Sequence, residues 1–204
     1  GEFDLPYRRL ADAVEEAYAA GLFGRNVLGT DFSCDIVVYR GAGAYVAGEA
    51  SGLISSLEGK KGYPRNRPPR LTVKGLYQRP TVVNNVESLS NIAWIINHGA
   101  DAFKAVGTPK SPGTRLFSVS GHINRPGVYE VELGYPWMKF LDEDCGGIPH
   151  GRAIKCVVPG GVSSKVLTGA DIANLKLSHE DLWDAGSTLG SGGMIVIAEG
   201  TCMV

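Results

Sequence analysis

The chain of 204 residues is long enough for one large domain or two small ones, and it is 44% hydrophobic and 20% charged. Its 20 Lys and Arg nearly balance 21 Asp and Glu, so the net charge of -1 gives no overall attraction to nucleic acid or to an anionic membrane. It contains no apolar run of membrane-spanning length, and its first residues lack the blocks of a signal peptide. These features indicate a globular protein of cytosolic type that recognises any anion locally.

The first part of the chain has the pattern of an α/β nucleotide-binding unit. Apolar residues at helical spacing predict an amphipathic helix over residues 6–22. Residues 34–39 have the composition of a short buried strand, which leads into a glycine-rich turn at residues 41–48 and a second helix over 49–57. In α/β folds of this order, ligands collect at the carboxyl ends of the strands.

Residues 58–80 differ in composition from the preceding segments, because they combine seven Lys and Arg with several prolines. They predict a stiff, solvated loop rather than a regular element, and a loop of this length often covers a site. A nucleic-acid surface is the weaker interpretation, since Tyr63 and Tyr77 are the only aromatic residues in the stretch. A further helix is predicted over 86–96, with Asn85 as its cap.

The second half of the chain has the pattern of short strands and helices that is typical of a small α+β module. We expect strands at 115–121, 128–133, 153–158 and 194–198 and a short helix at 136–143. The glycine-rich run 186–193 precedes its strand, the opposite order to a phosphate loop, and therefore indicates a hairpin or packing turn. Gly107, Pro109 and Pro112 are typical of a linker, so we expect one domain over 1–108 and another over 109–204.

Two predicted helix starts, after Gly48 and after Asn84 and Asn85, are candidate anion sites. The first amides of a helix lack intrahelical partners and carry the positive end of its dipole, so each start can hold a phosphate. We expect the two starts to face one another and to bracket one phosphorylated cofactor. The alternatives are a tight turn without ligand at Gly48 and simple helix capping by the asparagines. The dinucleotide fingerprint G-x-G-x-x-G/A fails at Val46.

The cysteines and histidines give no metal site. Four of each are scattered along the chain, without a C-x-x-C pair and without ligand spacing. We therefore assign no metal and no disulfide framework to these residues.

Three ordered motifs resemble one family. The segments at 40–49 (RGAGAYVAGE), 56–65 (SLEGKKGYPR) and 80–89 (PTVVNNVESL) are similar to the flavoprotein subunit of bacterial complex I, the NuoF type, and to its relatives in NAD-reducing hydrogenases and NAD-dependent formate dehydrogenases. The resemblance covers the whole chain. It implies an α/β fold, with part of a Rossmann-like FMN-binding domain followed by an α+β domain of the soluble-ligand-binding β-grasp type.

The resemblance also implies a function and a site. In this family, FMN accepts a hydride from NADH and passes electrons singly to an iron–sulfur cluster. The implied flavin-binding residues are Gly43, Tyr45, Gly48, Glu49, Val83, Asn84, Asn85 and Ser88. The implied nucleotide-binding residues are Tyr45, Ala50 and Arg70, and no residue is assigned as a catalytic acid or base. Of these residues, Glu49 is the one most expected to touch the flavin.

Further expectations follow from the family. A 4Fe-4S cluster is expected only in the parent protein beyond residue 204, and the expected partners are a thioredoxin-like 2Fe-2S subunit and an iron–sulfur subunit. The location would be cytoplasmic, peripheral to the inner membrane. The chain looks like the central fragment of such a subunit, because the family's N-terminal glycine-rich segment and its cluster-binding region are not in it; such a fragment is expected to be inactive alone.

Two positions depart from the family pattern. Position 50 is Ala where most members have an acidic residue, and position 70 is Arg where they tend to have an aromatic one. Both changes make the pocket more positive. We expect either a preference for a more anionic dinucleotide such as NADPH or weakened nicotinamide binding.

Two functions agree with these residues and with the resemblance. The leading one is a fragment of an electron-transfer subunit that oxidises NADH through FMN. The alternative is a non-catalytic β-grasp module that binds or assembles neighbouring subunits, with a vestigial flavin half. Flavin absorbance in the purified protein discriminates between them.

Overall fold

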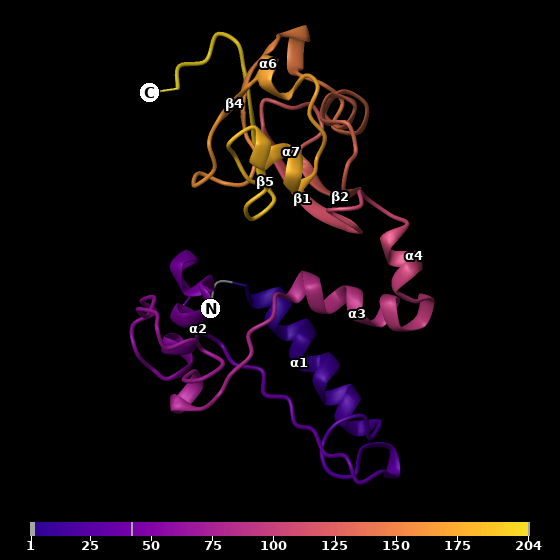
Figure 1. Ribbon diagram of the computed structural model, residues 1–204, viewed down its shortest axis with the longest axis vertical. Helices are drawn as coiled ribbons and strands as arrows, with labels where there is room; N and C mark the ends of the chain where they lie inside the picture. The colour runs from indigo at the N-terminus through magenta and orange to yellow at the C-terminus, as the bar shows by residue number, and fades with distance from the viewer. Residues whose placement is uncertain (1–2, 42, 204) are drawn as a thin grey trace. The chain divides into compact units, whose positions relative to one another are not determined.

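The computed structural model describes residues 3–41 and 43–203 (Figure 1). The chain forms two compact units, Gly1–Asn85 and Val86–Val204, which are called here the first unit and the sheet unit. The division lies earlier in the chain than the domain boundary predicted between residues 108 and 109, because the helix after Asn85 groups with the sheet. The assignment of the domains therefore stays a prediction.

The first unit consists of helices joined by long irregular segments. Its elements are α1 (Asp4–Ala19), η1 (Val27–Gly29), η2 (Tyr45–Gly48), α2 (Ala50–Leu57) and η3 (Leu76–Gln78). The helices predicted over 6–22 and 49–57 are confirmed as α1 and α2. The two differ in packing, since α1 has no buried residue whereas α2 buries Ile54 and three serines.

The buried strand predicted at residues 34–39 is wrong. The only ladder contact there is an isolated bridge between Cys34 and Gly24, and the apolar side chains are exposed, with Val37 at 84%. A short run of β-branched residues favours extended backbone, but a strand also needs a partner, and none of the described residues of the first unit supplies one. The strand, turn and helix order expected from the sequence is therefore reduced to a turn and a helix.

The sheet unit is a mixed α/β structure with a five-stranded sheet in the order β2-β1-β5-β3-β4. Strands β1 and β5 are parallel and the other neighbouring pairs are antiparallel. The strands are β1 (Thr114–Gly121), β2 (Gly127–Glu132), β3 (Ile154–Val158), β4 (Leu167–Thr168) and β5 (Gly193–Ala198). The helical elements are α3 (Val86–His98), α4 (Ala100–Lys104), α5 (Trp137–Lys139), the π-helical η4 (Phe140–Asp144), η5 (Pro149–Gly151), α6 (Gly169–Ile172) and α7 (His179–Asp184). The predicted hairpin, the two later strands, the helix after Asn85 and the short helix near 136–143 are confirmed, whereas β4, α6 and α7 were not predicted.

The hydrophobic core lies in the sheet unit. Alternate residues of β1 point inward, so Phe117 is fully buried, and its ring lies 6.1 Å from that of Phe140. The rings of Tyr129 and Phe140 are nearly perpendicular, with their centroids 5.5 Å apart, and Trp137 is also fully buried. Each such side chain stabilises the fold by about 1.5–3 kcal/mol through its removal from water.

The glycine-rich run before β5 is a packing turn, as predicted. Gly190 has a positive φ of 48°, and a Cβ there would lie 2.1 Å from the carbonyl oxygen of Gly160. The two backbone segments can approach this closely only because neither residue has a side chain.

Candidate functional site

The start of α2 is capped by a carboxylate. Glu49 Oε2 accepts hydrogen bonds from the amides of Ser51 at 2.9 Å and Gly52 at 3.0 Å, and from the Ser51 hydroxyl. The other oxygen of Glu49 accepts from Arg67 Nη2 at 2.8 Å. The Ser51 hydroxyl first, then the amides and Arg67, hold the pKa of Glu49 below its ordinary value, although desolvation opposes them. Glu49 is therefore an anion at neutral pH.

This cap corrects one expectation from the sequence. The amides at the start of α2 were expected to be available to a phosphate, but the carboxylate of Glu49 occupies those of Ser51 and Gly52. An internal anion already satisfies the helix dipole at this end. Any phosphate bound here must therefore be held by side chains rather than by these two amides.

A groove of about 600 Å³ lies beside the cap, within the first unit. It contains two guanidinium groups, two threonine hydroxyls and an apolar wall. Its lining residues are Ala50, Arg67, Pro68, Arg70, Leu71, Thr72, Thr81, Val82 and Val83. The structure thus brings together Ala50, Arg70 and Val83, three of the residues predicted for the site.

The basic loop that walls this groove is anchored by Glu58. The Glu58 side chain is 4% exposed and contacts Lys60 Nζ and Arg65 Nη2, each at 2.8 Å. It also accepts from the backbone amide of Tyr77 at 2.8 Å. The hydrogen bond from Lys60, followed by that from Tyr77, lowers the pKa of Glu58 from 4.5 to about 2. A single carboxylate thereby contacts the loop near its start, at Lys60 and Arg65, and near its end, at Tyr77.

Two serines of α2 form hydrogen bonds with Arg65 of the same loop. The Ser51 hydroxyl accepts from the amide of Arg65 at 2.8 Å, and Ser55 Oγ accepts from Arg65 Nε at 3.0 Å. Ser51 therefore links the cap at Glu49 to the loop. Sequence reasoning missed Arg67, Ser51 and Glu58, because their partners are brought together only by the path of the loop; the basic composition of 58–80 was the one available signal.

The other predicted residues of the first unit lie in the turn before α2 or at the end of the unit. Gly43 has a positive φ of 76°, which a residue with a side chain rarely adopts. Tyr45 is 83% exposed, and a Cβ on Gly48 would meet no atom within 4 Å. None of these three lines the groove, and Asn84 and Asn85 are exposed just after Val83.

The second predicted helix start belongs to the sheet unit. The helix α3 begins at Val86, directly after the asparagines as predicted, and Ser88 lies exposed in its first turn. Glu87 Oε1 accepts from the amide of Leu116 at 2.8 Å, which ties α3 to β1. The proposal that both helix starts contact one ligand stays a prediction.

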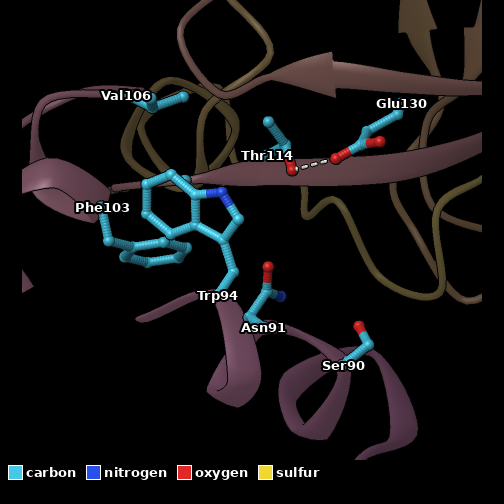
Figure 2. Close-up of a pocket in the computed structure, with 8 residues that line it drawn as sticks. Ser90, Asn91, Trp94, Phe103, Val106, Thr114 and Glu130 are labelled. Atoms are coloured by element: carbon cyan, nitrogen blue, oxygen red, sulfur yellow. Dashed lines mark hydrogen bonds between the residues drawn. The ribbon is translucent and has the colours of Figure 1, made fainter. Parts of the chain in front are cut away.

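The sheet unit has a hollow of its own, of about 390 Å³ (Figure 2). The Trp94 indole lies in the hollow, 6.2 Å from the Phe103 ring, and His98 stacks on it at 4.5 Å. Figure 2 shows Thr114 and Glu130, from the paired strands β1 and β2, across from Trp94 and joined by a hydrogen bond of 2.6 Å. A hollow lined by aromatic rings and a carboxylate suits a planar or cationic group. None of the predicted site residues lines this hollow.

The described residues contain neither a metal-binding cluster nor a membrane-spanning helix. Among residues 3–41 and 43–203, no group of three or more His, Cys, Asp or Glu is placed to hold a metal ion. No helix within these ranges combines the length and the hydrophobicity needed to cross a bilayer.

Comparison with known proteins identifies relatives of the whole chain. The Nuo51 FMN-binding domain family (Complex1_51K) matches residues 2–94. The F subunit of NADH-quinone oxidoreductase from Mycobacterium bovis is 46% identical over 204 residues, which is 100% of this chain and 45% of that protein. The F 2 subunit of NADH-quinone oxidoreductase from Rhizobium meliloti is 41% identical over 100% of this chain and 48% of its own length.

Solved structures agree with the sequence matches. An air-oxidised NAD⁺-reducing [NiFe]-hydrogenase is similar with a TM-score of 0.72 at 32% identity, over 96% of this chain and 32% of that one. The H₂-reduced state of such an enzyme gives a TM-score of 0.66 at 40% identity, over 78% of this chain and 26% of that one. The chain spans about half the length of the curated relatives it matches. Over its whole length the chain is therefore similar to a segment of the F subunits of NADH-quinone oxidoreductases, and residues 2–94 match the Nuo51 FMN-binding domain family.

Proposed function

We propose that the protein carrying this chain oxidises NADH with FMN and passes electrons to iron–sulfur clusters. The observation that supports this most is the groove beside the capped start of α2, which lies within the residues matched by the FMN-binding domain family. The named activity of the F subunits agrees with a nucleotide site there. The first unit would contribute part of the flavin and nicotinamide pocket.

The residues of the groove fit a phosphorylated, flat-ringed cofactor. Arg67 and Arg70 offer guanidinium groups, whose geometry matches phosphate oxygens. Leu71, Val82 and Val83 offer apolar surface to a ring system. FMN, when bound, supplies hydride acceptance from the nicotinamide and release of single electrons.

The chain's own residues have positioning and electrostatic roles in this proposal. Glu49 fixes the guanidinium of Arg67 and the first turn of α2 together, so it orients the groove. The hydrogen bond from Ser51 keeps Glu49 ionised, and this carboxylate makes the electrostatic potential at the groove more negative. The remaining residues proposed to complete the flavin site are Gly43, Tyr45, Gly48, Val83, Asn84, Asn85 and Ser88. The residues proposed for the nicotinamide nucleotide are Tyr45, Ala50 and Arg70.

The finer architecture and the partners are part of the same proposal. We assign residues 1–108 to part of a Rossmann-like FMN-binding domain and 109–204 to a β-grasp domain of the soluble-ligand-binding type. A 4Fe-4S cluster is proposed for the parent protein outside these residues. The proposed partners are a thioredoxin-like 2Fe-2S subunit and an iron–sulfur subunit, in a complex peripheral to the inner membrane on its cytoplasmic side.

The proposal is tested on the complete protein that carries this chain. After reconstitution with FMN, we expect visible flavin absorbance that is bleached by NADH under anaerobic conditions. Glu49→Gln should lower flavin occupancy, because it weakens the tie between Arg67 and α2. Glu15→Gln, on the exposed face of α1, is the matched control and should leave occupancy unchanged. A protein that binds no flavin after reconstitution would contradict the proposal.

The second candidate function is a binding or assembly module built on the sheet unit. It is favoured by the independent core of that unit and by the hollow at Trp94. If this is the function, the complete protein is colourless and cannot be reconstituted, yet it still assembles with neighbouring subunits.

A further inference from the structure

The hollow of the sheet unit, called here the Trp94 hollow, combines aromatic rings with a single charge. Trp94 and Phe103 line it with their rings, and Trp94 remains 41% exposed although the His98 ring stacks on it. Glu130 is the one charged residue among the described residues that line the hollow. No Lys or Arg within that described lining neutralises this carboxylate, so the hollow is negative as well as aromatic.

The polar atoms of the hollow are mainly acceptors. The Ser90 hydroxyl and Asn91 Nδ2 both donate to the carbonyl of Glu87, at 2.7 and 2.9 Å. The Thr114 hydroxyl donates to Glu130 Oε1 at 2.6 Å. Figure 2 shows the side-chain oxygen of Asn91 directed from α3 toward the strands. Because these donors are engaged within the protein, the oxygens of Asn91 and Glu130 are what the hollow offers to a guest.

A guanidinium group matches all of these features. It is planar, so it stacks on an aromatic ring, and it carries a positive charge that attracts both the ring face and Glu130. It also has five N–H donors, arranged so that two of them meet one carboxylate. An ammonium group carries the charge without the plane or the fork, and an anion would be repelled by Glu130. The hollow therefore favours an arginine-like cation over a lysine or a phosphate.

The surface beside the hollow favours a protein as the source of this cation. Leu116 is the register partner of Glu130, and Val128 lies two residues before Glu130 on β2, so the three side chains share one face of the sheet. Leu116 is 48% exposed and Val128 is 68% exposed. Strand β2 is also an edge of the sheet. A protein surface would cover this apolar face and the hollow together, whereas a small free cation would leave the face in water.

We propose that the Trp94 hollow receives an arginine side chain of a neighbouring protein subunit. The guanidinium stacks on the Trp94 indole and pairs with Glu130, while Leu116 and Val128 pack against apolar side chains around that arginine. The contact uses none of the groove residues of the first unit, so it is independent of the proposed flavin chemistry.

Side-chain labelling of the complete protein, alone and assembled with its neighbouring subunits, tests this contact. Hydroxyl radicals should oxidise Trp94 readily in the isolated protein and much less in the assembly. Phenylglyoxal, which modifies exposed arginines, should label one arginine of a neighbouring subunit before assembly but not after it. In an assembly made with Glu130→Gln, the same arginine should again be labelled.

Variants assign the contact to Glu130. Glu130→Gln keeps the shape of the side chain and an oxygen for Thr114, so it should fold normally. It should raise the Kd of assembly by about five- to tenfold, the effect of a lost charged contact to an interfacial arginine, and less at high salt. Glu130→Arg, combined with replacement of the protected arginine by Glu, should recover the binding that either change loses. Glu199→Gln, at an exposed residue outside the hollow, is the matched control and should change nothing.

Several results would overturn the proposal. Trp94 that is as reactive in the assembly as before, or no arginine whose protection depends on Glu130, would exclude the contact. Low reactivity of Trp94 already in the isolated complete protein would show that another part of the same protein fills the hollow. Protection of Trp94 within the assembly by N-acetyl-L-argininamide, a small guanidinium probe, would show that the hollow is open there and serves a free ligand instead.

Discussion

The two units of the chain are stabilised in different ways. Among the described residues, the first unit has only Ala47 and Ile54 as buried apolar side chains, whereas the sheet unit buries a contiguous cluster that includes Phe117, Trp137 and Phe140. The interior of the first unit is made largely of buried serines on α2, which hydrogen-bond to a basic loop.

This difference relates stability to function. Apolar burial gives the sheet unit a large and nonspecific stabilisation, so it can serve as a scaffold. Polar contacts contribute less each, but they fix charged side chains in one arrangement, as Glu49 fixes Arg67. The first unit therefore uses its polar residues to build the groove, and it should respond more strongly to pH and to the loss of single hydroxyl groups.

The largest effect is expected from Trp137→Ala. Because Trp137 is fully buried in the sheet unit, truncation should lower the free energy of unfolding of that unit by about 3–5 kcal/mol. Tryptophan fluorescence during denaturation reports this unit alone, since all three tryptophans lie in it. Trp183→Ala, at a side chain that is 67% exposed, is the control and should cost about 0.5 kcal/mol or less. Equal effects of the two changes would contradict the picture of a packed core.

A smaller effect is expected from Ser51→Ala in the first unit. Ser51 is 1% exposed, and its hydroxyl serves both Glu49 and the amide of Arg65. Its removal deletes two partly buried hydrogen bonds and should cost about 1–3 kcal/mol in total. Hydrogen exchange of residues 50–67 would show the loss, while tryptophan fluorescence of the sheet unit would not.

The exposed Ser163, whose side chain makes no hydrogen bond with the described residues, provides the control. Ser163→Ala should change neither signal. If Ser51→Ala also left exchange in 50–67 unchanged, the polar interior would not be what stabilises the first unit.

A still smaller, pH-dependent effect is expected at Glu58. Its pKa is lowered in the folded chain from 4.5 to about 2, so the ionised form is the one that the fold stabilises. The contribution of Glu58 is thus fully present above about pH 4.5 and is lost as the pH falls towards 2. Proteolysis of the loop at 60–79, measured across this range, should accelerate on acidification in the wild type.

In Glu58→Gln, cleavage of the loop should be faster at neutral pH and should lose most of its acid dependence. Glu15→Gln serves again as the matched control. An unaltered acid dependence in Glu58→Gln would assign the effect to another carboxylate.

The sequence predicted the sheet unit better than the groove. Alternating apolar residues around a glycine and proline turn were enough for the β1–β2 hairpin, and the capping signal at Asn85 was enough for the start of α3. Two signals were present but not used: Thr168 and Asp171 form the capping box of α6, and Ser178 caps α7 through the amide of Asp181. Strand β4 has two residues, too few for a periodic pattern.

The groove could be predicted only in part. Val83, Ala50 and Arg70 were expected from the family motifs, and they do lie together. The pairing of Glu49 with Arg67 could not be predicted, because it joins residues 18 positions apart through an irregular loop. The strand expected at 34–39 failed for a related reason, since local composition specifies extended backbone but not the partner that makes it a strand.

The most direct test of the account is hydrogen exchange of the complete protein with and without FMN. If the first unit carries the nucleotide groove, FMN should slow exchange in the turn at 43–49 and in the loop at 67–83, and leave the strands of the sheet unit unchanged. Flavin binding that protects neither of those two segments would contradict the central claim.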